Sequence, residues 1–314
     1  MRTLTLDARM DLPNVVVTVG TFDGVHLGHR AVLDTVKLQA RSRAGTAVVV
    51  TFDPHPRAVI HPDRAPGVLT CLPEKAWRIA PAGIDILAVV RFTESVRALS
   101  PNAFVEKYLV HLLGAQAVVV GYDHGFGRNR SGGLDEVQAL GKVYGFDVLS
   151  VDPMRSGGQP VSSTRIRQAV EAGNLAEAIP LLGGGYPISG RVVRGDGRGR
   201  DLGFPTANLH LQETGKLLPP NGVYAAWAHL SKAYKAVLNL GVCPTFTGKS
   251  RTLEAHIPGF SGNLYGEVVT LELMHRIREE RRFQTSDALV AQIRRDKETA
   301  ECVLSQTDVT LLRR

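Results

Sequence analysis

Two histidines, His26 and His29, stand in the stretch GTFDGVHLGH at residues 20–29, directly after the apolar run VVVTVG. An apolar run followed by glycines predicts a buried strand that leads into a helix. The start of a helix offers unpaired N–H groups and partial positive charge, which bind phosphates. On a first helical turn the two imidazoles would project on one face. There they could donate hydrogen bonds to a phosphate whose charge is changing, which indicates stabilisation of an adenylyl-transfer transition state.

Two other interpretations of the histidines are weaker. A metal site would need a third ligand, and the sequence offers none nearby. Two solvated surface histidines would leave the glycines and Asp23 unexplained. The spacing also differs from GxGxxG, so a nicotinamide cofactor is not indicated.

A second candidate site lies in GDGRGRDLGFPTANL at residues 195–209. Glycines and arginines can wrap phosphates, and in an extended segment Thr206 and Asn208 would share one face and offer oxygens to Mg²⁺. Taken alone, the composition also fits a flexible basic loop. The phosphate-binding candidates in the stretch are Gly195, Gly197, Gly199, Arg200 and Gly203.

The elements that would position the first site alternate between strand and helix up to about residue 170. Apolar runs at 15–20, 46–52, 85–92, 115–122 and 146–151 are separated by helix-period segments at 27–43, 74–81, 101–113 and 134–144. Runs without polar alternation suit strands that are buried on both faces. The fold class expected here is therefore α/β, with a doubly wound parallel sheet. A further helix is expected over STRIRQAVEAG, residues 163–173.

After the glycines at 183–185 strands follow strands, with no helix-length segment between them. This pattern predicts a small antiparallel β-barrel. One C-terminal helix is expected at about 286–306, with Ser286 as its N-cap. We expect two domains, residues 1–184 and 185–314, each with its own core and its own site.

Composition narrows the classes of function. The sequence has no run of about 18 apolar residues, so a membrane span is not expected. The N-terminal residues do not resemble a signal or transit peptide. Three scattered cysteines argue against a disulfide framework, so a cytoplasmic location is expected. The net charge of +7 invites a nucleic-acid partner. Since the arginines of HRIREERRF are mixed with Glu279 and Glu280, a solvated face is favoured and no nucleic-acid or membrane partner is expected.

Several motifs carry a family resemblance. HLGH resembles the HxGH motif of the nucleotidyltransferase superfamily, and SSTRIR at 162–167 resembles its second, phosphate-binding motif. With TFDPHP at 51–56, the longer stretch is similar to the FMN adenylyltransferase domain of bacterial bifunctional riboflavin kinase/FAD synthetases. LGFPTAN resembles the riboflavin kinase signature, and NGVYA, NLGVCPTF, LEAHI, LYGE and IREERRF follow in the order of that family.

The resemblance implies roles for individual residues. His26 and His29 would be catalytic in the first half, and Glu254 would take the proton of the ribityl 5′-hydroxyl in the second half. Thr206 and Asn208 would bind Mg²⁺ and ATP, together with the glycine-rich stretch. The remaining residues implied to bind ATP or flavin are Gly20, Thr21, Phe22, Asp23, Gly28, Phe52, Asp53, Asp123, Ser162, Ser163, Thr164 and Arg165.

The function expected from these motifs is bifunctional. Riboflavin and ATP would give FMN in the barrel, and FMN and ATP would then give FAD and pyrophosphate in the sheet domain. The substrates would be ATP, riboflavin and FMN, with Mg²⁺ as cofactor, and self-association is left open. Two alternatives are a nucleotidyltransferase for another substrate whose barrel only binds, and a flavin- or nucleic-acid-binding regulator without turnover.

Overall fold

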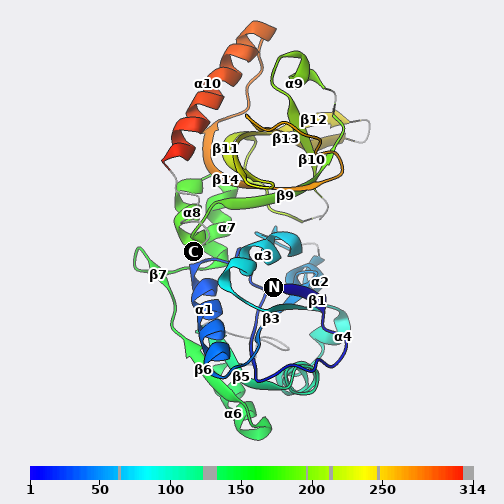
Figure 1. Cartoon of the computed structure of the whole chain (residues 1–314), viewed down its shortest axis with the longest axis vertical. Coiled ribbons are helices and arrows are strands. Elements are labelled where there is room, and N and C mark those ends of the chain that lie inside the picture. The colour runs from blue at the N-terminus through cyan, green and yellow to red at the C-terminus, as the bar shows by residue number, and fades with distance from the viewer. Residues whose placement is uncertain (63–64, 123–132, 196, 212–214, 246–247, 307–314) are drawn as a thin grey trace. The chain divides into compact units, whose positions relative to one another are not determined.

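The first half of the chain forms a parallel sheet whose strands alternate with helices (Figure 1). The computed structural model describes residues 1–62, 65–122, 133–195, 197–211, 215–245 and 248–306. Two units follow from the internal contacts of the chain. Unit 1 comprises Met1–Val68 and Lys75–Ser163, and unit 2 comprises Leu69–Glu74 and Thr164–Arg314.

Unit 1 contains the sheet strands β1 (Arg2–Thr5), β2 (Val15–Val19), β3 (Ala47–Asp53), β4 (Ile86–Arg91), β5 (Ala115–Gly121) and β6 (Asp147–Val151). Its longer helical segments are α1 (Leu27–Ser42), α3 (Leu72–Ile79), the π-helical η3 (Val105–Leu112) and α6 (Leu134–Tyr144). The shorter elements are α2 (Pro56–Ile60), η2 (Ala80–Ala82), α4 (Glu94–Arg97), α5 (Pro101–Phe104), β7 (Arg155–Ser156) and β8 (Gln159–Pro160). Helix α3 begins in the segment that belongs to unit 2.

The sheet has the strand order β1-β4-β3-β2-β5-β6, and all neighbouring strands are parallel. From β2 the chain proceeds to β3 and β4 on one side, and later to β5 and β6 on the other. In such sheets ligands bind at the carboxyl ends of the strands where the order reverses. GTFDGVHLGH follows the carboxyl end of β2, so the fold places the first candidate site at this reversal.

Both faces of the sheet are covered, which confirms the doubly wound class. On one face Val17, Val50 and Val90 belong to a core cluster with Phe104 and Leu109, from α5 and η3. Helix α1 packs against β2, β3 and β5. Because strand residues alternate between faces, Val49 and Thr51 point away from this cluster.

Unit 2 contains the closed antiparallel barrel predicted from the second half. Its strands are β9 (Tyr186–Val193), β10 (Thr206–His210), β11 (Gly222–His229), β12 (Ala233–Thr245), β13 (Gly248–His256) and β14 (Val268–Arg278), in the barrel order β10-β13-β12-β11-β14-β9. Its helices are α7 (Ser163–Glu171), α8 (Leu175–Leu182), α9 (Arg198–Asp201) and α10 (Ser286–Ser305).

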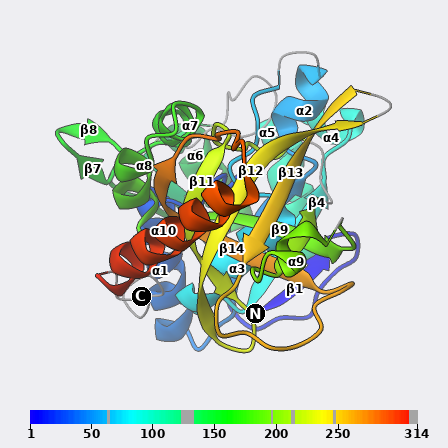
Figure 2. The same ribbon diagram turned by 90° about the horizontal axis from the view of Figure 1, so that it is seen from above.

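The C-terminal helix α10 lies across β11, β12 and β14 (Figure 2). Its Ala300 and Leu304 pack against Ala225, Trp227 and Met274 of the barrel. The expected N-cap was wrong by one residue. Thr285 is extended and its side chain accepts a hydrogen bond from the backbone N–H of Ala288, so Ser286 is the first helical residue.

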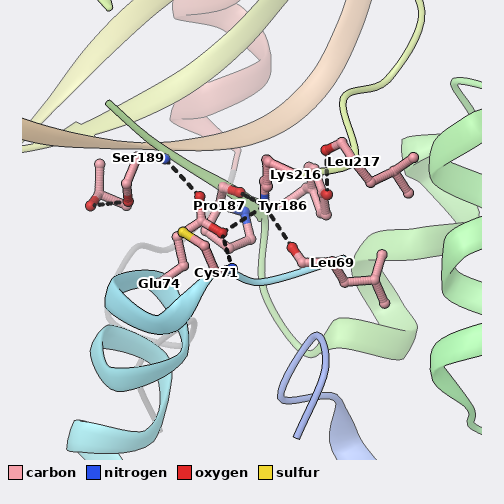
Figure 3. A network of polar contacts seen from close by, with 9 residues as sticks. Leu69, Cys71, Glu74, Tyr186, Pro187, Ser189, Lys216 and Leu217 are labelled. Atoms are coloured by element: carbon pink, nitrogen blue, oxygen red, sulfur yellow. Dashed lines mark hydrogen bonds and ion pairs between the residues drawn. The ribbon is translucent and has the colours of Figure 1, made fainter. Parts of the chain in front are cut away.

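A buried ion pair joins the segment 69–74 to the barrel strands within unit 2 (Figure 3). Lys216 Nζ donates to Glu74 Oε2 at 2.7 Å and to the carbonyl oxygens of Leu69 and Pro187, both at 2.6 Å. The two side chains are 2% and 0% exposed. We call this pair the Glu74–Lys216 clasp.

Further contacts complete the clasp. The Glu74 carboxylate accepts hydrogen bonds from the backbone N–H groups of Cys71, at 3.0 Å, and Ser189, at 2.8 Å. The Lys216 ammonium also lies 4.3 Å from the ring centre of Tyr186. Both charges are therefore fully hydrogen-bonded, which buried charges require.

The expected boundary at residues 184/185 lies after α7 and α8, whereas these helices belong to unit 2 by their contacts. Helix α8 packs against β9 and β14. The division into two parts that work independently stays a prediction, and fragments of the chain would test it.

Candidate functional site

The loop between β2 and α1 has an unusual backbone. Phe22, Gly24 and Val25 adopt positive φ values of 46°, 89° and 43°. A β-branched residue such as Val25 is strained there, at a cost of about 1–3 kcal/mol. Both Phe22 and Val25 are buried, and the Val25 N–H donates to the Phe22 carbonyl at 3.3 Å. The packing of these two side chains thus holds the loop in a strained backbone conformation. Such strain is found most often at functional sites.

The two histidines stand together at the start of α1. His26 is the N-cap, and its Nδ1 accepts a hydrogen bond from the backbone N–H of His29 at 3.4 Å. The rings are stacked, with centroids 3.7 Å apart and an angle of 15° between their planes. A Cβ at Gly28 would lie 3.2 Å from the His26 ring, so a side chain at position 28 would displace that ring.

Both imidazoles are neutral near pH 7. Burial lowers the pKa of His26 to about 4, against a raising effect of Asp23 and with a further lowering by Arg78. Burial, His26 and Lys75 lower the pKa of His29 well below its usual value. Because His26 Nδ1 accepts a hydrogen bond, the proton of the neutral ring is on Nε2, which can donate to a ligand. His29 Nδ1 is buried and has no hydrogen-bond partner among the described residues.

The second motif meets the first within unit 1. Ser163 Oγ donates to the Asp23 carbonyl oxygen at 2.9 Å, and a Cβ at Gly28 would be 3.7 Å from the carbonyl oxygen of Val161. Gly20 packs against the ring of Phe22, and the Thr21 carbonyl oxygen accepts a hydrogen bond from Thr51 Oγ1. The structure therefore brings together residues that are far apart in the sequence, as the prediction of one phosphate site requires.

The rest of the second motif begins helix α7, where Ser163, Thr164 and Arg165 form the first turn. Arg165 Nε donates to Glu177 Oε1 of α8 at 3.2 Å. Glu177 was not among the predicted residues, because nothing in the sequence indicates that α8 folds back onto this turn. It holds the guanidinium that we expect to contact a triphosphate.

The TFDPHP stretch is divided between core and loop. Phe52 is buried and packs against Phe92 and Phe104, in the core of unit 1. Asp53 ends β3, and its carbonyl oxygen accepts from the Phe92 N–H. A ligand role for either residue stays a prediction. Asp123 lies outside the described residues.

In the barrel the predicted kinase residues share the outer face. Leu253 and Ala255 are buried inside the barrel, so Glu254 between them points outward. Asn208 of β10 pairs with Glu254 of β13 in register, and Asn239 of β12 pairs with Glu254 on its other side. Paired residues on neighbouring antiparallel strands have side chains on the same face. The amide predicted to bind metal thus flanks the predicted base.

The glycine-rich stretch approaches these residues closely. A Cβ at Gly195 would collide with the Asn208 amide, and one at Gly199 would lie 3.3 Å from Thr206 Oγ1. Gly197 and Gly203 have positive φ values of 76° and 83°. Arg200 is exposed in α9 and its backbone N–H donates to the Gly197 carbonyl. The stretch is therefore folded over β10. Glycine is needed at Gly195 and Gly199 for close approach to β10, and at Gly197 and Gly203 for the positive φ values.

Comparisons with known proteins match both halves of the chain. A family model for FAD synthetase matches residues 8–165, and one for riboflavin kinase matches residues 182–304. The bifunctional riboflavin kinase/FMN adenylyltransferase of Escherichia coli K12 is 41% identical over 91% of both chains. That of Listeria monocytogenes is 36% identical over 97% of both.

The chain belongs to the bifunctional riboflavin kinase/FMN adenylyltransferase family. Like the family, it phosphorylates riboflavin to FMN and adenylylates FMN to FAD, which confirms the expected function. ATP and flavins are therefore its substrates. A crystal structure described as a macrolide-efflux protein from Streptococcus pneumoniae has the same fold, with a TM-score of 0.82, 30% identity and coverage of 95% and 98%. Within the described residues, no helix is long and apolar enough to span a membrane.

Lys75 and Arg78, whose charges act on the histidine pair, were not singled out from the sequence. Both are buried charged residues of α3, and each lowers the pKa of one histidine of the pair. The segment PEKAWRI does contain a signal, because charges interrupt the apolar face that a packed helix should have. Its ordinary interpretation is a solvated helix surface, and only the structure shows that these cations face inward.

Proposed function

We propose that the two activities use two separate sites, one at the start of α1 and one on the outer face of the barrel. The observation that supports this best is the register of Asn208 and Glu254, which pair on the barrel of unit 2, whereas His26 and His29 belong to unit 1. Each site has its own phosphate-binding backbone, the starts of α1 and α7 in one and the glycine-rich stretch in the other.

In adenylyl transfer, a phosphate oxygen of FMN attacks the α-phosphorus of ATP, and the bond from that phosphorus to the bridging oxygen of pyrophosphate breaks. His26, neutral and protonated on Nε2, donates a hydrogen bond to an α-phosphate oxygen as its charge grows. Such a preformed donor is worth about 10²-fold or more in rate. His29 lies against it, and the α7 turn with Arg165 holds the leaving pyrophosphate.

In riboflavin phosphorylation, the 5′-hydroxyl oxygen attacks the γ-phosphorus of ATP and the bond to ADP breaks. Glu254 accepts the hydroxyl proton. Positioning and charge neutralisation supply most of the rate in phosphoryl transfer, so the glycine-rich stretch and Asn208 should contribute more than the base.

The oxygen donors of β10 fit Mg²⁺. Thr206 and Asn208 share a face of the strand and offer a hydroxyl and an amide oxygen, the hard ligands that this ion prefers. In the described part of the chain no cluster of three or more His, Cys, Asp or Glu could hold a metal. This agrees with an ion that is bound by one or two protein groups and by substrate phosphates. Bound there, Mg²⁺ would neutralise charge on the transferred phosphoryl group.

A crossed pair of variants tests the two-site proposal. His29→Ala should lower FAD formation from FMN by about 10²-fold or more while FMN still accumulates from riboflavin. Glu254→Gln should stop riboflavin phosphorylation while added FMN is still converted to FAD. Equal loss of both activities in one folded variant would contradict two separate sites. Asn239→Ala at the flank of Glu254 should reduce only the kinase rate.

A cytoplasmic location and the absence of nucleic-acid and membrane partners belong to the same proposal. The location is supported by the three scattered cysteines, which do not suggest a disulfide framework. The absence of these partners is supported by the mixed charges of HRIREERRF. Self-association is left open, and sedimentation of the purified protein would decide it.

A further inference from the structure

Lys75 is a buried cation beside the histidine pair. It lies in α3 within unit 1, and only 4% of its surface is exposed. A charge is costly to bury, so an apolar residue would suit a purely structural position better. We therefore expect the positive charge of Lys75 to have a function at this buried position.

A chain of two hydrogen bonds connects Lys75 to the strained loop of the site. Lys75 Nζ donates to Thr51 Oγ1 at 3.0 Å, and the same hydroxyl donates to the Thr21 carbonyl oxygen at 3.3 Å. A hydroxyl has one proton, so both bonds fix its orientation. Thr21 lies directly before Phe22, the first residue of the left-handed turn. The ammonium thus helps to hold the backbone that presents His26.

The charges around the histidines define the second part of the role. His29 is faced by His26 from its own helix and by Lys75 from α3. His26 is faced by Asp23 from the loop and by Arg78 from α3. After burial and His26, Lys75 is the third cause that lowers the pKa of His29. A stacked pair 3.7 Å apart would repel if both rings were charged.

We propose that Lys75 is a positioning residue for adenylyl transfer, which orders the Thr21 loop through Thr51 and keeps a buried positive charge beside the stacked histidines. This inference rests on the proposed role of the histidine pair. Lys75 is not proposed to contact the phosphates or the flavin. It acts through Thr51 and through the charge state of His29.

Four variants of the full chain separate these effects. Lys75→Met removes both the hydrogen bond and the charge, whereas Lys75→Arg keeps the charge. Thr51→Val removes only the hydroxyl. Lys142→Met is the matched control, because Lys142 is an exposed lysine of α6 in the same unit. For each variant, kcat and KM for ATP in FAD formation are measured against pH, and circular dichroism with thermal unfolding reports on correct folding.

We expect Lys75→Met to lower kcat/KM for FAD formation by about 10- to 100-fold, the cost of misplaced catalytic groups. The acid limb of its kcat/KM profile should move to higher pH, because His29 loses a neighbour that lowers its pKa. Thr51→Val should lower kcat/KM without moving the limb. Lys75→Arg should keep the limb of the wild type, and Lys142→Met should match the wild type throughout.

A Lys75→Met variant with an unmoved acid limb would overturn the role of the Lys75 charge, and one with the kcat/KM of the wild type would overturn its role in positioning the Thr21 loop. If Lys75→Met fails to fold, a displaced limb in Lys75→Arg or in Thr51→Val would overturn the role of the charge instead. His29→Ala separates this inference from the proposed function. If that variant forms FAD at the rate of the wild type, the role of the histidine pair fails; if it is slowed while Lys75→Met is normal, only the role of Lys75 fails.

Discussion

Replacing Lys216 with methionine is expected to destabilise the barrel unit strongly. Methionine has a similar length but no charge, so the buried Glu74 carboxylate would lose its ionic partner and keep only the N–H groups of Cys71 and Ser189. Breaking a fully buried ion pair by removing one partner costs about 3–5 kcal/mol. The carbonyl oxygens of Leu69 and Pro187 would also lose their donor.

The expected loss can be stated as a shift in melting temperature. For a unit of this size, 1 kcal/mol corresponds to about 2–4 °C, so the variant should melt about 10 °C lower. Glu74→Gln should have a comparable effect, because the Lys216 ammonium would stay buried without a counter-charge. The double variant Glu74→Gln/Lys216→Met should be more stable than the sum of the single effects predicts, since neither charge is then left alone.

Tryptophan fluorescence can follow the barrel alone. The chain has two tryptophans, and Trp227 is the one in the barrel. In a Trp77→Phe background, thermal unfolding would report only on the surroundings of Trp227. The kinase activity that remains after heating provides an independent readout of the same unit.

A surface pair serves as the matched control. Lys297 and Glu301 of α10 are 3.7 Å apart and are 39% and 47% exposed. Lys297→Met should therefore change stability by no more than about 0.5 kcal/mol. If Lys216→Met melts at the same temperature as Lys297→Met, the clasp does not stabilise the barrel and the reasoning from its burial is refuted.

Three other predictions follow from features of the two units. Because burial lowers the pKa of His26 to about 4, kcat/KM for FAD formation should stay constant as pH falls through 6.5 and decline only well below it; a limb near 6.5 would contradict a neutral buried pair. Gly28→Ala should slow FAD formation but not FMN formation, since its Cβ would press on the His26 ring, and equal rates would show that the ring can move freely. Residues 186–314 alone should still make FMN but melt below the full chain, because they lack Glu74 and Leu69; in that fragment Lys216→Met should cost less than in the full chain, and an equal cost would argue against the clasp.

The sequence was sufficient to predict both kinds of sheet, whereas the phosphate-binding role of the two glycine-containing stretches stays a prediction. Apolar runs such as VVVTVG and TAVVVTF form buried parallel strands because side chains on both of their faces must be covered. The helix expected at 134–144 is found at those residues, where local periodicity is strong. Spacing alone also predicted that His26 and His29 share one face of α1, as their stacked rings confirm.

Features that depend on distant residues were not predictable in this way. Strand β1 has no recognisable pattern of its own and is defined by its pairing with β4. Strand β10 was expected only as an extended segment, because its place between β9 and β13 depends on barrel closure. The left-handed Val25 contradicts its own conformational preference, and only its burial in the tertiary structure explains it.

The buried charged residues were the hardest feature to predict from the sequence. Glu74, Lys75 and Lys216 are of residue types that usually lie on the solvated surface. The hydrogen bonds Lys75–Thr51 and Lys216–Glu74 join residues that are 24 and 142 positions apart in the sequence. A sequence without an alignment gives no sign of such pairs. Their partners can be found only once β9 and the end of β3 are placed in three dimensions.

The clasp also has a consequence for the order of events during synthesis. Lys216 follows Glu74 by 142 residues and Ser189 follows it by 115. At about 5–20 residues per second, the ribosome adds Lys216 about 7–28 s after Glu74. The chain of unit 1 is complete once Ser163 has been added, before Ser189 and Lys216, whereas the segment 69–74 still waits for these partners. The two units therefore cannot fold strictly one after the other from the N-terminus. The barrel has to bind a segment that left the ribosome before the barrel was synthesised.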